Sequence, residues 1–335
     1  MARASEALRP IARPFRRHRV ALAIGLLLVC IAVAHGYNML HWPYIEDDEG
    51  DYLSRAWAVF HLGKLTPNTY YYDHVPLGWI QIAIWRLITG AAPLSSLASG
   101  RTLMLLFQLG SALLVIYIGR RASGKLWVGL LAAALFSLLP FGLQYQRRIL
   151  LDNICTFWLL ASLAVLCGRV TLTRVFISAV AFAIAVLSKE IALAALPALA
   201  VMVGRRYSRE QRLFAVWGWL GLALSLCSIY VLGALIKGEL FPAGTALGGT
   251  HPHVSLICSI EWQASRGADG GILDSASGFW HAVSSWVHAE PLLVVGGTAA
   301  MAYLIIMRRR NVIASTIAWM TLSLWLFLGR GGQVS

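Results

Sequence analysis

Long apolar runs recur along almost the whole of this 335-residue sequence, and they constrain its fold more than any other feature. A helix that crosses a bilayer needs about 20 mainly apolar residues. Charged residues make up only 13% of the chain, whereas soluble domains contain about 25%. The sequence therefore predicts an all-α polytopic membrane protein and argues against a soluble globular enzyme. The candidate spans are 20–37, 101–119, 126–142, 149–167, 213–235, 287–307 and 312–328.

Two further apolar stretches do not fit a simple span. Residues 174–204 are apolar except at Ser188, Lys189 and Glu190, and are too long for one span but short for two. The run 77–89 is too short to cross and contains polar side chains. We therefore expect 174–204 to form a broken pair of short helices and 77–89 to lie flat at the membrane surface.

The distribution of basic residues indicates the orientation in the membrane. With 77–89 lying flat, one side of the membrane holds 18 basic residues and two acids, and the other holds 10 basic residues and 13 acids. Lys and Arg accumulate in cytoplasmic loops. This predicts about nine spans in the plasma membrane, a cytoplasmic basic tail at 1–19 and a C-terminus outside. Because the net charge of +13 comes in short blocks between apolar runs, it does not indicate nucleic acid.

The spans assign two large loops to the outer side, at 38–100 and 236–286, within a single transmembrane domain at 20–335. Part of the first loop has the spacing of an interfacial helix, with a polar remainder and an apolar face. The residues of that apolar face are Leu53, Ala56, Trp57 and Phe60, and the polar ones are Asp51, Ser54, Arg55 and His61. The segment 77–89 is the second expected interfacial helix.

Acidic residues concentrate directly after the first span, with five acids among the six residues 46–51. One interpretation is a solvated loop that contributes to the topology. The other is a catalytic carboxylate at the membrane surface, since mutual repulsion among these acids calls for a cation or a reacting group.

Three further polar clusters fall on the same side. Asp152 lies just inside an apolar run, where a charge is costly, and either pairs with Arg148 or has a function. Lys189 either pairs with Glu190 or faces an anionic headgroup. The last cluster is Arg330, which is followed by two glycines.

The combination of carboxylates with Lys, Arg and His suits a phosphate leaving group and a hydroxyl acceptor. No Walker loop or Rossmann glycine motif is present, which argues against a nucleotide donor inside the cell. The pair His251 and His253 is weak evidence for metal, so we expect no cofactor.

These motifs, in this order, resemble the GT-C class of membrane glycosyltransferases. The similar group is glycosyltransferase family 39, which includes bacterial protein O-mannosyltransferases and lipid A aminoarabinose transferases. The resemblance rests on Asp48-Glu49 with Tyr52, then Gly63, Tyr70–Tyr72, His74-Val75-Pro76-Leu77, Asp152, Ser188-Lys189, Trp286–Leu293 and Arg330-Gly331-Gly332. Val75 replaces a proline of the family pattern.

The resemblance implies an inverting transfer of a sugar from a polyprenyl-phosphate donor to a hydroxyl acceptor outside the membrane. Asp48 is implied as the general base, with Glu49 in the same catalytic pair and Asp152 orienting a substrate. The implied ligands of the lipid phosphate are Lys189 and Arg330, with His74 and Arg148 near it.

Family members carry further spans after the Arg-Gly-Gly motif, so we expect this chain to be incomplete at its C-terminus. The alternatives are a polyprenyl-lipid flippase and an inactive fragment of a transferase.

Overall fold

The computed structural model describes residues 9–90, 96–265 and 271–329, and over these ranges the chain is helical and contains no β-strand. Three helices are long and apolar enough to cross a membrane: α2 (Arg9–Gly36), α5 (Ser96–Ser123) and α11 (Arg209–Ile236). The prediction of an all-α membrane fold is therefore confirmed, whereas the number of crossings stays a prediction.

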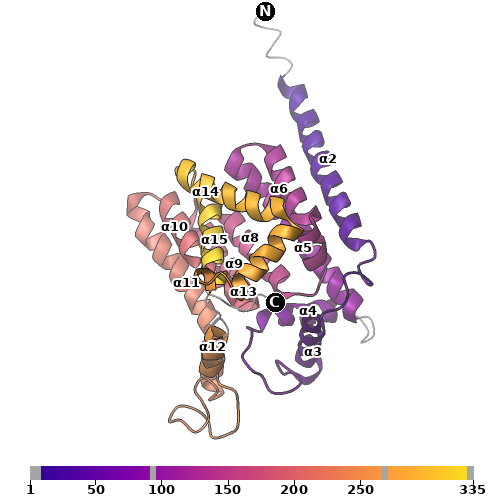
Figure 1. Cartoon of the computed structure of the whole chain (residues 1–335). Coiled ribbons are helices and arrows are strands. Elements are labelled where there is room, and N and C mark those ends of the chain that lie inside the picture. The colour runs from indigo at the N-terminus through magenta and orange to yellow at the C-terminus, as the bar shows by residue number, and fades with distance from the viewer. Residues whose placement is uncertain (1–8, 91–95, 266–270, 330–335) are drawn as a thin grey trace, which may run out of the picture.

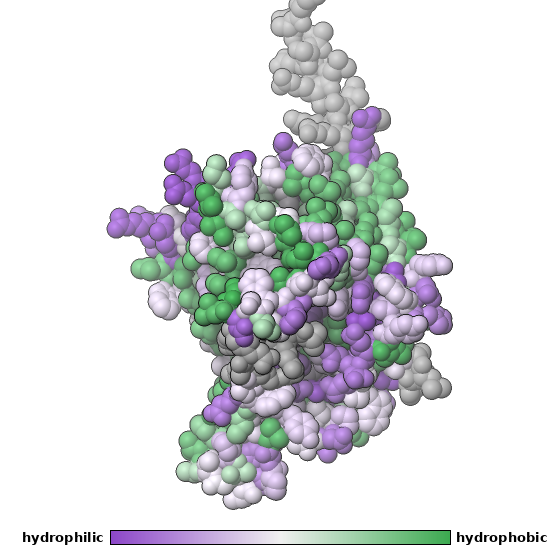
Figure 2. Space-filling view, in the orientation of Figure 1, coloured by the Kyte–Doolittle hydropathy of each residue, from purple (hydrophilic) through white to green (hydrophobic). Residues whose placement is uncertain are grey.

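Shorter helices fill the bundle between the long ones (Figure 1). They are α6 (Leu126–Leu138), α7 (Pro140–Tyr145), α8 (Leu151–Leu166), α9 (Leu172–Ser188), α10 (Leu196–Arg206), α14 (Gly297–Met307) and α15 (Val312–Leu328). In Figure 1, α3 (Asp47–Leu62) and α4 (Leu77–Thr89) lie together below the bundle, and α12 (Leu256–Ser265) projects beneath it. Figure 2 shows hydrophobic surface over α2 and much of the body, with hydrophilic residues at the upper left and near α3.

The largest core lies where α8 and α9 pack against α10, α11 and α15. Its fully buried members include Phe182, Leu199 and Trp219. A second core, around Trp79 and Met104, joins α3 and α4 to α5 and to the start of α8. This second core fixes α3 and α4 to the bundle, so side chains at the start of α3 have a defined position.

Two local predictions from the sequence are confirmed. Helix α4 covers residues 77–89, and it ends at Gly90, which adopts a left-handed conformation with φ of 62°. The stretch 174–204 is broken after Ser188, where α9 ends and a 3-10 helix, η2 (Glu190–Ala195), leads into α10.

The predicted span at 287–307 is sharply bent near its start, and its crossing of the membrane stays a prediction. The chain bends by 109° between α13 (Gly278–Ala289) and the helical segment Leu292–Met307, which opens with the π-helix η4 (Leu292–Gly296). Pro291 has no N–H to continue a helix. In addition, the buried Glu290 accepts a hydrogen bond from the backbone N–H of Phe141.

One residue of the first expected interfacial helix departs from the prediction. Arg55, expected on the polar side, is buried in α3. Arg55 is buried because Asp51 and Asp73 both bind its guanidinium, and Trp79 packs beneath it.

Candidate active site

The acidic run of the first loop is the N-terminus of a helix. Glu46 is the N-cap of α3, and it forms a capping box in which Glu49 bonds back to the Glu46 backbone N–H. Acidic side chains are stabilised at a helix N-terminus by unpaired N–H groups and by the helix dipole. The repulsion expected among the acids is thus partly offset by the backbone.

Glu49 is fully buried and holds three segments together. Its carboxylate binds Arg101 of α5 through two contacts, of 3.0 and 2.7 Å, and accepts a hydrogen bond of 2.9 Å from the Ile149 N–H. Arg101 in turn donates to the carbonyl groups of Met39 and Pro43. Glu49 therefore fixes the start of α3 against α5 and the approach to α8.

Asp48, its neighbour, is exposed, and its carboxylate has no hydrogen bond or ion pair with the described residues. Burial raises the pKa of the Tyr52 hydroxyl, and the negative charges of Asp48 and Asp152 raise it further. Asp48 also lies one helical turn before Tyr52 on the same face of α3.

Asp152, at the start of α8, forms an ion pair with Lys189, at the break after α9, with 2.6 Å between Oδ2 and Nζ. The alternative pair with Arg148 does not form, because Arg148 binds Glu46. Lys189 likewise binds Asp152 in preference to Glu190. Two polar clusters that the sequence separates by 37 residues are thus one site.

The helix α4 supports this break directly. Gln81 donates to the Ser188 hydroxyl (3.0 Å) and accepts from the Trp158 indole (2.8 Å). A Cβ on Gly78 would lie 2.6 Å from a Leu151 methyl group and 3.1 Å from the Ser188 carbonyl, so a larger residue would have to displace both. Helix α4 therefore packs against Ser188, the residue directly before Lys189.

His74 approaches the same break from the other side. Its Nδ1 lies 2.9 Å from Oε1 of Glu190, and its ring centroid lies 6.4 Å from that of Tyr52. The Tyr70 hydroxyl donates to the His74 carbonyl (2.6 Å), which fixes the backbone there. The side chain is one quarter exposed, and its Nε2 has no hydrogen bond with the described residues.

Asp73 anchors the segment that carries His74. Both of its oxygens bind Arg55, at 2.9 and 2.7 Å. Burial opposes ionisation of Asp73, but the hydrogen bonds and charge of Arg55 dominate and lower its pKa below the usual value. The carboxylate is therefore ionised at neutral pH and holds α3 to this segment.

Of the predicted site residues, the structure brings Asp48, His74, Asp152 and Lys189 around Tyr52 and the α9 break. Arg148 lies beside them through its pair with Glu46, while Arg330 lies outside the described residues. Sequence reasoning missed Glu190 as the partner of His74 and Arg101 as the partner of Glu49. No local pattern signals either pair, because the partners are far apart in the chain.

The paired histidines of the second loop do not form a metal site in the described part of the chain, where no three His, Cys, Asp or Glu side chains gather suitably. The ring centroids of His251 and His253 lie 4.8 Å apart with the planes tilted by 37°, and His253 bonds to backbone carbonyls. His251 lies near Glu239, which accepts a hydrogen bond from Tyr72.

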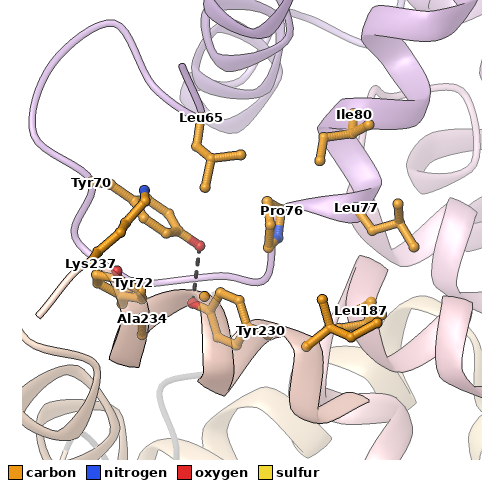
Figure 3. Close-up of a pocket in the computed structure, with 12 residues that line it drawn as sticks. Leu65, Tyr70, Tyr72, Pro76, Leu77, Ile80, Leu187, Tyr230, Ala234 and Lys237 are labelled. Atoms are coloured by element: carbon orange, nitrogen blue, oxygen red, sulfur yellow. Dashed lines mark hydrogen bonds between the residues drawn. The ribbon is translucent and has the colours of Figure 1, made fainter. Parts of the chain in front are cut away.

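An apolar pocket of about 240 Å³ adjoins the His74 segment and the end of α9 (Figure 3). Within it, the Tyr70 and Tyr230 hydroxyls lie 3.0 Å apart, and Lys237 is the sole charged lining residue among those described. The lining residues are Leu65, Tyr70, Tyr72, Pro76, Leu77, Ile80, Leu187, Ile229, Tyr230, Gly233, Ala234 and Lys237. Sequence reasoning did not anticipate this pocket, since it is built from four separate segments.

Solved membrane enzymes share this fold. ArnT from Cupriavidus metallidurans, solved bound to undecaprenyl phosphate, is 16% identical with a TM-score of 0.63 over 95% of this chain and 56% of its own. The Pmt1-Pmt2 protein O-mannosyltransferase of S. cerevisiae, bound to its sugar donor, is 18% identical, with a TM-score of 0.53 over 65% of this chain and 34% of that one. The Archaeoglobus fulgidus oligosaccharyltransferase is 15% identical, with a TM-score of 0.53 over 90% of this chain and 39% of that one.

These similarities confirm the predicted GT-C-like fold and identify the chain as a membrane protein. The chain spans about a third to just over half the length of these structures. No family model matches the sequence, and no curated protein sequence matches it.

Proposed function

We propose that this chain is the catalytic part of an integral-membrane glycosyltransferase. It transfers a sugar from a polyprenyl-phosphate donor to a hydroxyl acceptor, with inversion, on the extracytoplasmic side of the plasma membrane. The observation that carries this proposal is the meeting of Asp152, Lys189 and His74 at the α9 break, beside Tyr52 and one helical turn from the unpaired Asp48 carboxylate. The shared fold with ArnT, whose structure holds undecaprenyl phosphate, supports it.

The chemistry follows from the charges. Asp48 accepts the proton of the acceptor hydroxyl as its oxygen attacks the anomeric carbon of the sugar. The bond from that carbon to the phosphate oxygen breaks, and the polyprenyl phosphate leaves with the electron pair. Lys189 and His74 stabilise the charge that builds on the phosphate, and Arg148 and Arg330 complete its surroundings.

The remaining acids take supporting roles. Asp152 holds the Lys189 ammonium in place and orients a substrate through its second oxygen, since it is half exposed. Glu49, expected in the catalytic pair, acts as a positioning residue, because both of its oxygens are buried and bound. Its burial fixes the helix start from which Asp48 projects.

We assign the polyprenyl chain next to the phosphate to the apolar pocket. The pocket is smaller than the roughly 300–1,000 Å³ of typical ligand sites, so it holds part of a chain and not a whole lipid. Tyr70 connects it to the His74 carbonyl, and Leu187 lies two residues before Lys189. The polyprenyl chain and the phosphate of the donor thus occupy adjoining sites.

The test of this function is sugar transfer by the full-length protein in proteoliposomes, with long-chain and short-chain polyprenyl-phosphate donors. Gly233→Trp is expected to fill the pocket, because a Cβ there meets no atom within 4 Å. Loss of about 60 Å² of apolar contact at ~25 cal/mol/Å² would raise KM for the long-chain donor roughly tenfold. The short-chain donor should be affected less.

Gly221→Trp is the matched control, since Gly221 lies in the same helix, outside the pocket, and also has open space. Equal effects of both variants would overturn the pocket assignment. Absence of transfer by the parent protein with every polyprenyl-phosphate sugar would overturn the function itself.

A second expected result concerns Glu190, which holds the His74 ring with Nε2 free for the phosphate. Glu190→Gln should weaken donor binding roughly tenfold, as for loss of a hydrogen bond between charged groups. Because Glu190 acts through His74, His74→Ala and the His74→Ala/Glu190→Gln double variant should bind the donor equally. Glu261→Gln, an exposed change in α12, serves as control. Additive losses in the double variant would contradict this coupling.

A further inference from the structure

Arginines from three helices converge on the end of α8 that lies away from the candidate active site. Arg121 of α5 donates to the Cys167 carbonyl (2.9 Å), Arg206 of α10 to the Gly168 carbonyl (2.6 Å) and Arg174 of α9 to the Val165 carbonyl (3.4 Å). Carbonyl groups at a helix C-terminus attract cations. Since α9 rises about 1.5 Å per residue, Arg174 is about 22 Å from Lys189 along its axis.

Gly168, which has no side chain, leaves room for one of these arginines. A Cβ on Gly168 would lie 1.3 Å from Nη1 of Arg174, so the guanidinium occupies the space of a side chain. Arg174 is therefore held directly over the last turn of α8.

A shallow pocket of about 10 Å³, with room for about one water molecule, lies beside Arg174 and Arg206. Its rim carries Arg169, Arg174 and Arg206 with Tyr207, and its wall is formed by Leu166, Val170, Val175 and Val203. Arg174 and Arg206 each use one guanidinium nitrogen on a carbonyl, which leaves the other nitrogens available.

No carboxylate balances this rim within the described residues. Among all the described residues, every ion pair involves an acid of the outer loops, of the α8 start or of the α9 break, and none involves the rim. Three like charges around one pocket repel one another unless an anion joins them. Arginine forks bind phosphate oxygens through paired, charge-assisted hydrogen bonds.

We propose that the three arginines around this shallow pocket bind the phosphate group of an anionic phospholipid at the protein surface. The helix ends place the rim at one end of the bundle, where a headgroup lies, and the exposed Val170 offers an apolar contact for the glycerol and first chain carbons. Basic pockets between membrane helices bind anionic headgroups in this way. The site is independent of the proposed transferase chemistry.

The experiment measures retained lipid on the full-length protein purified from mixed phosphatidylglycerol and phosphatidylcholine bilayers, by native mass spectrometry. Arg174→Gln/Arg206→Gln should lower retention of phosphatidylglycerol by about fivefold for each arginine. The control is Arg308→Gln/Arg310→Gln, which removes the same charge from exposed arginines. Retention of phosphatidylcholine should not change.

Arg174 and Arg206 also cap α8, so a folding defect needs its own check. Arg169→Gln removes a rim charge from an exposed residue that makes no hydrogen bond with the described residues, and it should still lower retention about fivefold. Equal loss in the pocket and control variants would overturn the site, because attraction to surface charge would then explain it. If inorganic phosphate stabilised the protein against thermal unfolding as much as phosphatidylglycerol does, the assignment to a lipid would be overturned.

Discussion

Replacing Asp48 with asparagine in the full-length protein is expected to slow sugar transfer by about 10²–10⁴-fold, the usual contribution of general base catalysis. Asparagine keeps the size of the side chain but cannot accept the proton of the acceptor hydroxyl. Donor binding should survive, since Lys189 and His74 lie on other segments. The measurement is transfer from a radiolabelled polyprenyl-phosphate sugar, with donor binding determined separately.

Asp47→Asn is the matched control, because Asp47 lies in the same first turn of α3 and is also exposed. It should transfer at close to the parent rate. If Asp47→Asn lost activity while Asp48→Asn kept it, the choice of base within the acidic run would be wrong. If both variants were fully active, the transferase proposal would fail.

The second large effect is on stability, at the buried pair of Glu49 and Arg101. Both side chains are completely inaccessible, and Glu49→Gln leaves the Arg101 charge without its partner. Breaking such a pair costs about 3–5 kcal/mol. We therefore expect Glu49→Gln to unfold at a markedly lower temperature in detergent, measured on the full-length protein by thermal unfolding.

Asp51→Asn provides the comparison, because Asp51 pairs with Arg55 while about half exposed. The buried Arg55 keeps Asp73 as its partner in this variant, so the loss should approach the roughly 0–1 kcal/mol of an exposed pair and the protein should unfold close to the parent temperature. A double variant, Glu49→Gln/Arg101→Gln, should recover part of the lost stability, since no unpaired charge remains. A Glu49→Gln protein with parent stability and no transfer would favour a direct catalytic role for Glu49 over a positioning one.

The sequence alone determined the membrane class, the extent of α4 and the break at Lys189. Each of these depends on hydrophobicity or on a local interruption of it, such as three polar residues within an apolar run. These features can be predicted without knowledge of tertiary contacts, because bilayer thickness sets the length of a span and burying a charge in it is costly. The order of the motifs also indicated the fold, which the solved structures share.

Only the tertiary structure decided which charges meet. Local spacing offered Arg148 for Asp152 and Glu190 for Lys189, whereas the folded chain pairs Asp152 with Lys189 and Glu190 with His74. Likewise, the spacing of α3 placed Arg55 on a polar face, but two carboxylates draw it inward. A buried charge pairs with the partner that packing brings nearest. Packing depends on contacts between residues far apart in the sequence, such as Ile149 and Glu49, which are 100 positions apart.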